Sequence, residues 1–346
     1  MLGIGLIGCG RIGALHARTI AASPDCRLAV AFDTDTDRAR ALAEPAGAAV
    51  ASTAEDVIAD GRVDAVFICS PTNTHVPLGL AAIAADKPVF CEKPLDLDPR
   101  RAAEVPAALE RRDLQFMVGF HRRFDPAHRR LKEAIEGGRL GAVETVLVVS
   151  RDPAPPPIGY VKASGGLFKD MAIHDLDMIA WLTGWTFEGV HARGAALVDP
   201  AIGRAGDIDT ASMTLWDGHG RACTILNSRR SGIGFDQRVE AYGSVASATV
   251  ENALDAPFAL HDAGGRRGGP LPHHFPERYA AAYPAQLAAF VSAVRDGGPV
   301  PTTAADGLRA LLLAEACGRS AWTGAPVAID RSPETTSGSD HRERSI

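Results

Sequence analysis

The stretch Leu2-Gly3-Ile4-Gly5-Leu6-Ile7-Gly8-Cys9-Gly10-Arg11-Ile12-Gly13 decides the fold of the first part of this chain. An apolar run, Leu2–Ile7, leads into a GxGxxG pattern, and a helical pattern begins where the glycines end. In such a strand–turn–helix the first glycine permits a tight turn, the second lets a pyrophosphate approach the backbone, and the third lets the helix pack on the strand. The helix N-terminus then faces the phosphates. The residues predicted to bind a dinucleotide here are Gly8, Gly10, Arg11, Ile12 and Gly13.

An acidic residue completes this fingerprint. Asp33 closes the second predicted strand, about 20 residues beyond Gly13. A carboxylate there accepts hydrogen bonds from the adenosine ribose and repels a 2′-phosphate, which favours NAD over NADP. Arg38 lies nearby and could be recruited to a phosphate, so use of both cofactors stays open. The alternative is a glycine-rich turn followed by a solvated aspartate.

Short apolar runs alternate with helical patterns as far as residue 120, which predicts a doubly wound parallel sheet. The predicted strands are Leu2–Ile7, Leu28–Phe32, Ala65–Cys69, Pro88–Cys91 and Gln115–Val118, and the predicted helices are Ile12–Ala22, Asp37–Ala43, Val76–Ala85 and Arg100–Arg111. Residues 1–120 are therefore predicted to form an α/β Rossmann domain that binds NAD.

The pattern changes after residue 120, because strands now follow one another without helices between them. Such a run is typical of a large, mainly antiparallel open sheet. The predicted strands are Val143–Val149, Gly189–Val198, Ala211–Trp216, Ala222–Asn227, Gln237–Tyr242 and Ala246–Val250, and the predicted helices are Asp125–Glu136, His174–Leu182, Tyr279–Arg295 and Ala304–Trp322. Residues 264–272 are predicted to be a loop. Residues 121–330 are thus predicted to form an α+β domain for substrate binding and oligomerisation, and residues 331–346 a polar tail expected to be disordered.

Composition narrows the class of protein. The net charge of −6 argues against nucleic acid or an anionic membrane as partner, and no apolar run is long enough to span a bilayer. The chain opens directly into a predicted strand, so we expect no signal peptide and a cytoplasmic protein. The six cysteines are scattered without a CxxC pair, which favours buried reduced thiols over structural zinc.

A polar loop follows the third core strand, and ligands in this fold bind at the carboxyl ends of the strands. Ser70, Pro71, Thr72 and His75 are therefore expected to contact the cofactor near its ribose and nicotinamide. The same loop could serve to cap the next helix through its polar side chains. Both interpretations can hold together, and His75 alone fits a structural position better than a catalytic one.

Two further segments carry candidate chemistry. Cys91-Glu92-Lys93-Pro94 follows a strand and brings Lys93 to the carboxyl edge of the sheet, although a strand-exit lysine without function would look the same. In Gly165–Asp177, the residues Asp170, His174 and Asp177 stand at i, i+4 and i+7 and share one face of a helix. An Asp–His pair one turn apart suits a base with its orienting carboxylate. Spacing alone would equally fit a solvated face. A metal site is not expected, since no third clear ligand is present.

Together, Gly8–Gly13, Glu92-Lys93-Pro94 and Gly165-Gly166…Asp170…His174 resemble the GFO/IDH/MocA oxidoreductase family, in the right order and over nearly the whole chain. Gly119–Asp125, Ser150–Pro157 and Gly165–Asp177 look more narrowly like the inositol 2-dehydrogenases of that family, and Glu277-Arg278-Tyr279…Tyr283 and Ala304–Ala316 are similar too.

The resemblance implies a catalytic triad of Lys93, Asp170 and His174. His174 would take the hydroxyl proton while hydride leaves for the nicotinamide. Lys93 would stabilise negative charge on the substrate oxygen, and Asp170 would orient His174 or pass the proton on. Motif position adds Glu92, Lys93 and Arg122 to the cofactor contacts. It gives the substrate contacts as Lys93, Arg122, Asp152, Asp170, His174, Asp177 and Phe235.

Two positions depart from the family pattern near the expected pocket. Phe235 stands where relatives often carry tyrosine, and His121 where they often carry methionine. Phenylalanine cannot donate a hydrogen bond. The sequence therefore predicts the reaction class more firmly than the substrate.

The leading hypothesis is NAD-dependent oxidation of a cyclitol hydroxyl, with myo-inositol converted to 2-keto-myo-inositol. A dehydrogenase of another sugar, polyol or inositol isomer is the first alternative. A non-catalytic NAD-binding regulator is the second, against which the intact triad argues. Family members usually associate through the open face of the second sheet, often as tetramers, so a homotetramer is expected through the strand-rich region Gly189–Val250.

Overall fold

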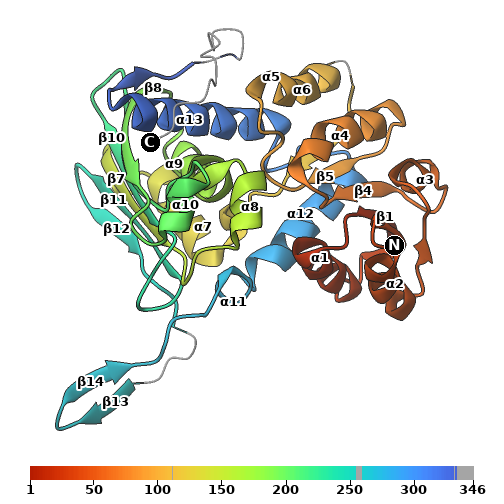
Figure 1. Ribbon diagram of the computed structural model, residues 1–346, viewed down its shortest axis with the longest axis horizontal. Coiled ribbons are helices and arrows are strands. Elements are labelled where there is room, and N and C mark those ends of the chain that lie inside the picture. Colours follow the sequence, from red (N-terminus) through yellow and green to blue (C-terminus); the bar gives the residue numbers. More distant parts are fainter. Residues whose placement is uncertain (111, 255–258, 331, 333–346) are drawn as a thin grey trace.

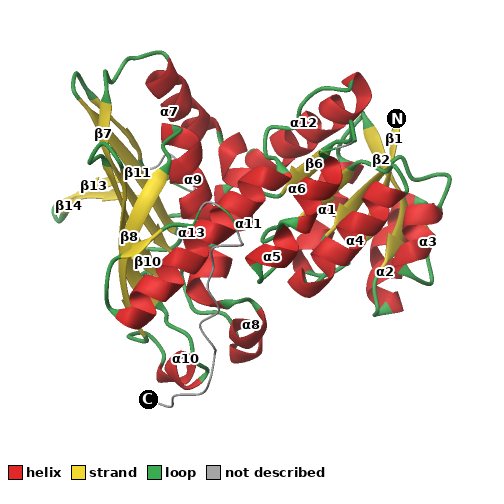
Figure 2. Ribbon diagram, turned by 90° about the horizontal axis from the view of Figure 1, so that it is seen from above, coloured by secondary structure: helices red, strands yellow, loops and turns green. Residues whose placement is uncertain are grey.

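The computed structural model describes residues 1–110, 112–254, 259–330 and 332 of the 346 residues. The predicted tail lies, apart from residue 332, outside the described residues. Two sheets stand side by side, each with helices packed against it (Figures 1 and 2). No helix in the described part of the chain is both long and apolar enough to cross a membrane.

The first sheet confirms the predicted parallel α/β fold. Over the described residues its strands run in the order β3-β2-β1-β4-β5-β6, all parallel. They are β1 (Leu2–Ile7), β2 (Cys26–Phe32), β3 (Ala49–Val50), β4 (Ala65–Ile68), β5 (Val89–Cys91) and β6 (Phe116–Val118). The order reverses direction between β1 and β4, and in open α/β sheets ligands bind beyond the carboxyl ends of the strands at this point.

The helices of the first sheet depart from prediction in two places. They are α1 (Arg11–Ala21), α2 (Thr36–Ala43), α3 (Ala54–Ala59), α4 (His75–Ala84), α5 (Pro99–Ala102) and α6 (Glu104–Leu109), with short 3₁₀ turns at Glu44–Ala46, Thr72–Thr74 and His121–Phe124. Strand β3 and helix α3 were not predicted, because each is too short for a periodic pattern. The predicted single helix over residues 100–111 is wrong, and two short helices stand there. Pro106 has no N–H to bond to the Ala102 carbonyl, so the helical ladder is interrupted at that turn.

The second sheet confirms a mainly antiparallel arrangement. Over the described residues the order is β12-β11-β7-β10-β9-β8-β15, and β7 and β10 are the parallel pair. The strands are β7 (Val143–Arg151), β8 (Phe187–Ala195), β9 (Thr210–Asp217), β10 (Ala222–Ser228), β11 (Asp236–Gly243), β12 (Ser247–Val250) and β15 (Val327–Ala328). Side chains alternate along each strand, and one face of the sheet carries the core.

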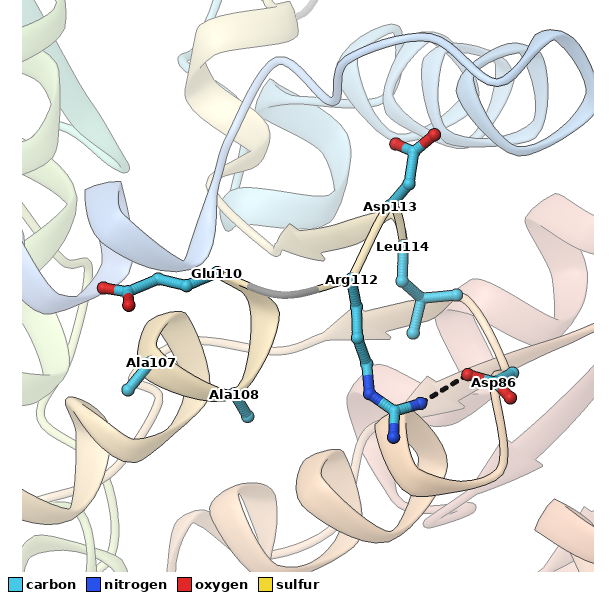
Figure 3. A pocket seen from close by; sticks show the side chains of 7 residues that line it. All are labelled: Asp86, Ala107, Ala108, Glu110, Arg112, Asp113 and Leu114. Carbon is cyan, nitrogen blue, oxygen red and sulfur yellow. Dashed lines mark hydrogen bonds and ion pairs between the residues drawn. The ribbon is translucent and has the colours of Figure 1, made fainter.

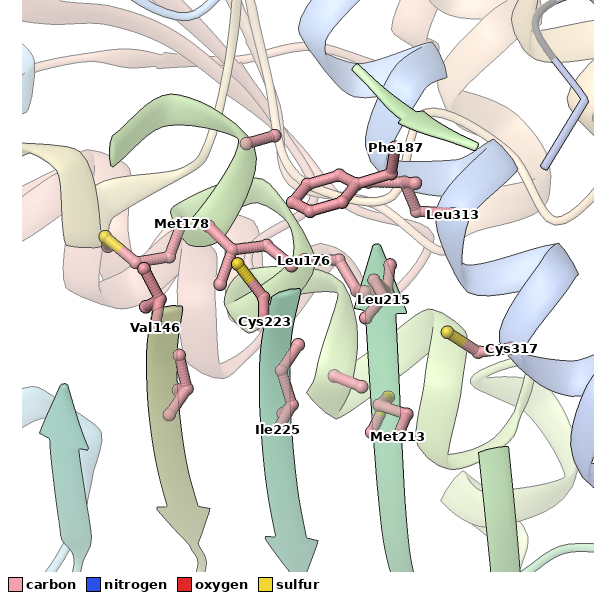
Figure 4. Packing of buried hydrophobic residues seen from close by; sticks show 14 of the residues in the cluster. Val146, Leu176, Met178, Phe187, Met213, Leu215, Cys223, Ile225, Leu313 and Cys317 are labelled. Atoms are coloured by element: carbon pink, nitrogen blue, oxygen red, sulfur yellow. The ribbon is translucent and has the colours of Figure 1, made fainter. Parts of the chain in front are cut away.

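That core lies between the sheet and two long helices. Leu176 and Met178 come from α9 (Ile173–Thr183) and Leu313 from α13 (Ala304–Thr323), and they pack on inward side chains of the strands (Figure 4). The remaining helices are α7 (Pro126–Glu136), α8 (Ile158–Ala163), α10 (Pro200–Arg204), α11 (Phe275–Arg278) and α12 (Ala282–Asp296), with a π-helical turn at Phe168–Ala172. Ile173, the first residue of α9, packs instead in a core cluster of the first sheet, which brings the start of α9 next to that sheet.

Three further features differ from the predicted elements. Residues 264–272 are not simply a loop, because β14 (Gly265–Gly268) pairs with β13 (Ala259–Asp262) in a hairpin that projects from the body (Figure 1). A two-residue turn, Ala263-Gly264, joins the two strands, and β14 opens with Gly265 at φ +105°. The predicted helix from residue 279 begins at Ala282. Helix α12 packs on the first sheet: its Leu287 and Phe290 belong to the same core as β1 and α1.

Candidate active site

The glycine-rich loop leaves open space where a pyrophosphate would lie. A Cβ on Gly13 would stand 2.0 Å from the Gly8 carbonyl oxygen, and one on Gly8 (φ +94°) would stand 2.5 Å from the Ser70 nitrogen. A Cβ on Gly10 would meet nothing within 4 Å, and Gly10 begins α1 without any side-chain cap. Uncapped N–H groups at a helix N-terminus bind anions. The loop therefore fits the pyrophosphate of a dinucleotide.

Asp33 lies directly beside this loop. Its carboxylate accepts hydrogen bonds from the backbone N–H of Cys9 (2.7 Å) and of Asp35 (2.9 Å). These bonds hold the carboxylate next to the turn, as a ribose contact requires. Arg38 is paired with Asp35 at 3.1 Å and is largely exposed. Arg38 therefore pairs with the carboxylate of Asp35.

The loop after β4 is braced internally. The Ser70 and Thr74 hydroxyls are 2.6 Å apart, and Thr74 donates to the Pro71 carbonyl. The buried His75 has its two ring nitrogens 2.7 Å from the Pro94 carbonyl and 2.8 Å from the Ser70 carbonyl. Both nitrogens of His75 thus join two loops of the protein, which gives this residue a structural role.

Lys93 is held at both ends. Its backbone N–H donates to Glu92, whose other carboxylate oxygen lies 2.8 Å from Nε2 of His16 on α1. The Lys93 Nζ donates to the Asp170 backbone carbonyl at 2.8 Å and to its Oδ1 at 3.3 Å. The peptide bond between Lys93 and Pro94 is cis. Glu92 therefore anchors the lysine loop to the cofactor-facing helix.

The Asp170 carboxylate has partners that the sequence did not suggest. Tyr160 donates to Oδ1 at 2.7 Å, and both terminal nitrogens of Arg229 lie 3.3 Å from Oδ2. Burial works against the ionised form, but the charges of Lys93 and Arg229 and the hydrogen bond from Tyr160 lower the pKa of Asp170. Tyrosines and arginines remote in the chain carry no spacing signal, so sequence reasoning missed these two.

His174 lies close enough to Lys93 for the lysine charge to act on it, but His174 is not bonded to Asp170. Across the described ranges no hydrogen bond joins the two residues, and the buried Nδ1 of His174 has no partner there. The predicted Asp170–His174 pairing assumed a regular α-helix, whereas Asp170 sits in the π-turn Phe168–Ala172. Burial, then the positive charges of Lys93 and Arg122, lower the pKa of His174 well below its usual value. A neutral imidazole of this kind can accept a proton.

Arg122 belongs to a buried polar network. It donates to Asp175 at 2.5 Å and to Ser150 at 3.3 Å, and Asp175 also accepts from Asn227 at 2.7 Å. Its guanidinium lies 5.7 Å from the centre of the Tyr279 ring. Asp175 was not among the predicted site residues, although it stands next to His174 in the chain.

The two predicted substrate carboxylates other than Asp170 lie in different surroundings. Asp177 is buried in a two-bond ion pair with Arg123, at 2.5 and 2.9 Å, which occupies both its oxygens. Asp152 instead lies in the field of Arg229 and Asp170, and burial raises its pKa to about 6. Asp177 is therefore held in a structural ion pair with Arg123, whereas Asp152 lies close enough to Asp170 and Arg229 for their charges to act on it.

Aromatic side chains line the same region. The buried Phe235 stacks on His274 at 5.7 Å, and its ring meets Tyr279 edge-on. His121 lies 5.0 Å from His174 between ring centres, and it stacks on Tyr283 at 4.9 Å. The buried Nε2 of His121 has no hydrogen-bond partner among the described residues. The two departures from the family pattern therefore both contact Tyr279.

Other parts of the described chain offer less. The hollow in Figure 3 lies at the far end of α6, where Arg112 pairs with Asp86, and contains none of the predicted site residues. Within the described ranges no three His, Cys, Asp or Glu side chains stand close enough to share a metal ion.

Comparison with known proteins agrees with this geometry. An inositol 2-dehydrogenase of Rhizobium meliloti is 41% identical over 316 residues, covering 91% of this chain and 96% of the relative. A myo-inositol 2-dehydrogenase of Thermotoga maritima is 41% identical over 92% of this chain and 95% of the relative. The crystal structure of a scyllo-inositol dehydrogenase from Lactobacillus casei, with NAD(H) and scyllo-inositol bound, has a TM-score of 0.90 at 29% identity over 95% of this chain and 99% of that chain.

Family models match almost the whole chain. Residues 2–120 match the oxidoreductase family with an NAD-binding Rossmann fold, and residues 132–329 match its C-terminal alpha/beta domain. The chain belongs to the GFO/IDH/MocA family of NAD-binding oxidoreductases.

Proposed function

We propose that this protein oxidises a cyclitol hydroxyl to a ketone with NAD, and that myo-inositol, giving 2-keto-myo-inositol, is its substrate. One observation carries the proposal: the Lys93 ammonium is bonded to Asp170, and its charge acts on the buried His174, at the carboxyl edge of a sheet whose glycine loop fits a dinucleotide. The 41% identity to inositol 2-dehydrogenases supports the choice of a cyclitol.

Each residue of the triad has a distinct task. NAD held at the glycine loop by Gly8, Gly10 and Gly13 would supply the hydride acceptor for the carbinol carbon. His174 accepts the hydroxyl proton, for which its lowered pKa keeps it neutral. Lys93 donates a hydrogen bond to the same oxygen and stabilises its developing negative charge. Asp170 holds the Lys93 ammonium group in place. The products are the ketone, NADH and one proton.

Substrate hydroxyls away from the reacting carbon need their own partners. We assign Asp152 and Arg122 to that task, together with His121, whose buried Nε2 has no partner among the described residues. Phe235 supplies an apolar wall. The proposed contacts omit Asp177, since its carboxylate is taken up by Arg123.

The test is a screen of cyclitols and sugars for NADH formation, run with NAD and with NADP. We expect turnover with myo-inositol and NAD, and loss of turnover in Lys93→Ala with NAD binding retained, because the Lys93 side chain is not part of the glycine loop that would hold the phosphates. Absence of activity on every cyclitol would refute the substrate class. Unchanged turnover in Lys93→Ala would refute the triad.

A second inositol isomer is the alternative substrate that a specific observation favours. A scyllo-inositol 2-dehydrogenase of Bacillus subtilis is 31% identical over 94% of this chain. We expect His121 and Phe235, which depart from the family pattern, to affect which isomer is preferred. The ratio of the activities on myo- and scyllo-inositol decides between the two substrates.

We also propose that the protein assembles as a homotetramer through the open face of the second sheet. A second proposal is that it works in the cytoplasm. Leu147 on β7 and Tyr242 on β11 are 39% and 53% exposed on the face opposite the helices. Apolar side chains on an uncovered sheet face are typical of subunit interfaces. All six cysteines are free and buried, as expected for a reducing compartment. Light scattering tests the assembly, and a monomer would contradict it.

A further inference from the structure

The Asp170 carboxylate is surrounded by donors from three separate elements. Lys93 reaches it from the loop after β5, Tyr160 from α8, and Arg229 from the end of β10. None of the hydrogen bonds that the described residues make to the Asp170 carboxylate comes from α9, the helix that carries His174. This arrangement identifies the lysine, not the histidine, as the catalytic group that Asp170 contacts.

Tyr160 is unusual because its ring and its hydroxyl lie in different environments. The residue is 44% exposed, yet its hydroxyl donates to the largely buried Asp170 at 2.7 Å. Burial and the neighbouring carboxylate raise the pKa of Tyr160, so its hydroxyl stays protonated and remains a donor. Helix α8 is short and follows the proline-rich segment Pro153–Pro157, which delivers Tyr160 to this position.

Arg229 approaches from the opposite side. It is 2% exposed, and its backbone N–H donates to the Asp209 carbonyl at 2.8 Å. Two of its nitrogens face the same Asp170 oxygen at 3.3 Å. A buried guanidinium needs a counter-charge, and Asp170 supplies it.

We propose that Tyr160 and Arg229 are positioning residues, which keep the Asp170 carboxylate ionised and aimed at the Lys93 ammonium. They act on the reaction through Lys93, so their effect on turnover rests on the proposed function. Their effect on the ionisation of Asp170 does not depend on the proposed function.

Several other charges act on this cluster and must be counted. Asp152, in the loop after β7, and Asp207, before β9, are like charges that oppose ionisation of Asp170. Arg11 in the glycine loop acts on Tyr160 from the cofactor side. Lys93 and Arg229 outweigh burial and the two carboxylates, because the pKa of Asp170 is lowered overall. Removing one donor shifts this balance toward the protonated acid.

The first experiment replaces one hydroxyl. Tyr160→Phe keeps the exposed ring and removes only the hydrogen bond to Asp170. The Asp170 carboxyl is followed by NMR of protein labelled with ¹³C-aspartate, and its signal is assigned with Asp170→Asn. We expect the pKa of Asp170 to rise by about one pH unit, since a hydrogen bond to a charged group has a net strength of that order. The matched control Tyr242→Phe removes a hydroxyl from β11 on the open face of the second sheet, and light scattering of this variant checks that subunit assembly is unchanged.

Kinetics then test whether Asp170 acts through Lys93. In Tyr160→Phe we expect kcat at neutral pH to fall by up to about ten-fold, because the Asp170 carboxylate stays ionised but is held less firmly toward Lys93. We expect the acid limb of the pH profile to move up with the Asp170 titration. The KM for NAD stays unchanged. A purely structural role would lower stability and leave both the titration and the pH profile in place.

Arg229 supplies the second comparison. Arg229→Lys keeps a cation near Asp170 and should restore most of the titration and kcat lost in Arg229→Met. Equal Asp170 titrations in the wild type and Tyr160→Phe would overturn the proposal, whatever the activity. A wild type inactive on every cyclitol would instead refute the proposed function and leave the titration to decide about Tyr160 and Arg229.

Discussion

Replacing Gly10 by alanine tests the cofactor site without disturbing the fold. The backbone at Gly10 has φ −70° and ψ −163°, which alanine adopts freely, and the added Cβ meets no atom within 4 Å. Alanine is a poorer first residue for α1 than glycine, but it also reduces the entropy of the unfolded chain. These effects oppose each other, so we expect the free energy of unfolding to change by less than about 1 kcal/mol.

Binding of NAD should respond very differently. The methyl group would occupy the space that the pyrophosphate needs next to the N-terminus of α1. Losing one charge-assisted hydrogen bond costs about 1.5–3 kcal/mol. This corresponds to a rise in Kd of about 10- to 150-fold. Calorimetric titration with NAD measures the Kd, and urea unfolding measures the stability of the same sample.

Gly13 provides the matched comparison. Its Cβ would stand 2.0 Å from the Gly8 carbonyl oxygen, inside any van der Waals contact, so Gly13→Ala must displace backbone. We expect Gly13→Ala to lose stability and NAD binding together. The exposed Gly61, whose Cβ also meets nothing within 4 Å, is the control that should change neither. If Gly10→Ala binds NAD within two-fold of the wild type, the pyrophosphate does not lie at this loop.

Four individual side chains give further predictions. Asp33→Ala should weaken NAD more than NADP in a binding titration, because the carboxylate contacts ribose and repels the 2′-phosphate; equal losses would remove Asp33 from that role. His121→Met removes the unpartnered Nε2 and should change the ratio of KM values for myo- and scyllo-inositol with the Kd for NAD unaltered; an unchanged ratio would exclude His121 from substrate contact. Asp177→Asn breaks a buried ion pair and should lower the free energy of unfolding by about 3–5 kcal/mol in urea. Asp152→Asn should instead abolish a rise in cyclitol KM as the pH falls through about 6, where the wild-type carboxyl of Asp152 becomes protonated; a pH-independent KM in the wild type would argue against a carboxylate contact there.

The cofactor half of the protein could be predicted because its signals are local. The three glycines act through their own backbone, and each has the surroundings that its place in the motif predicts. Asp33 stands at a fixed distance from them along the chain. Most strands of the first sheet alternate with helices of ordinary length, so the spacing of apolar residues indicates which segments are strands and which are helices. Strand β3 and helix α3, two and six residues long, were too short to produce a recognisable periodic pattern.

The substrate half could be predicted only in part, since its contacts join distant segments. Helix α9 is buried on nearly all sides, so the period of its apolar residues does not show which face meets the site. Asp177 was consequently chosen as a substrate contact, although it pairs with Arg123, whereas Asp175 was passed over and holds Arg122. Tyr160 and Arg229 lie 10 and 59 positions from Asp170 and form no motif with it.

The placement of Lys93 shows why the two halves must be considered together. Its backbone is tied through Glu92 to His16, and His16 sits on α1, the helix whose first turn faces the cofactor phosphates. Its ammonium group is tied to Asp170, whose other partners come from the second sheet and α8. The lysine is therefore fixed from the cofactor side at one end and from the substrate side at the other. A displacement of either domain would move Lys93 relative to the reacting oxygen, and for that reason its position depends on contacts that no single segment of the sequence contains.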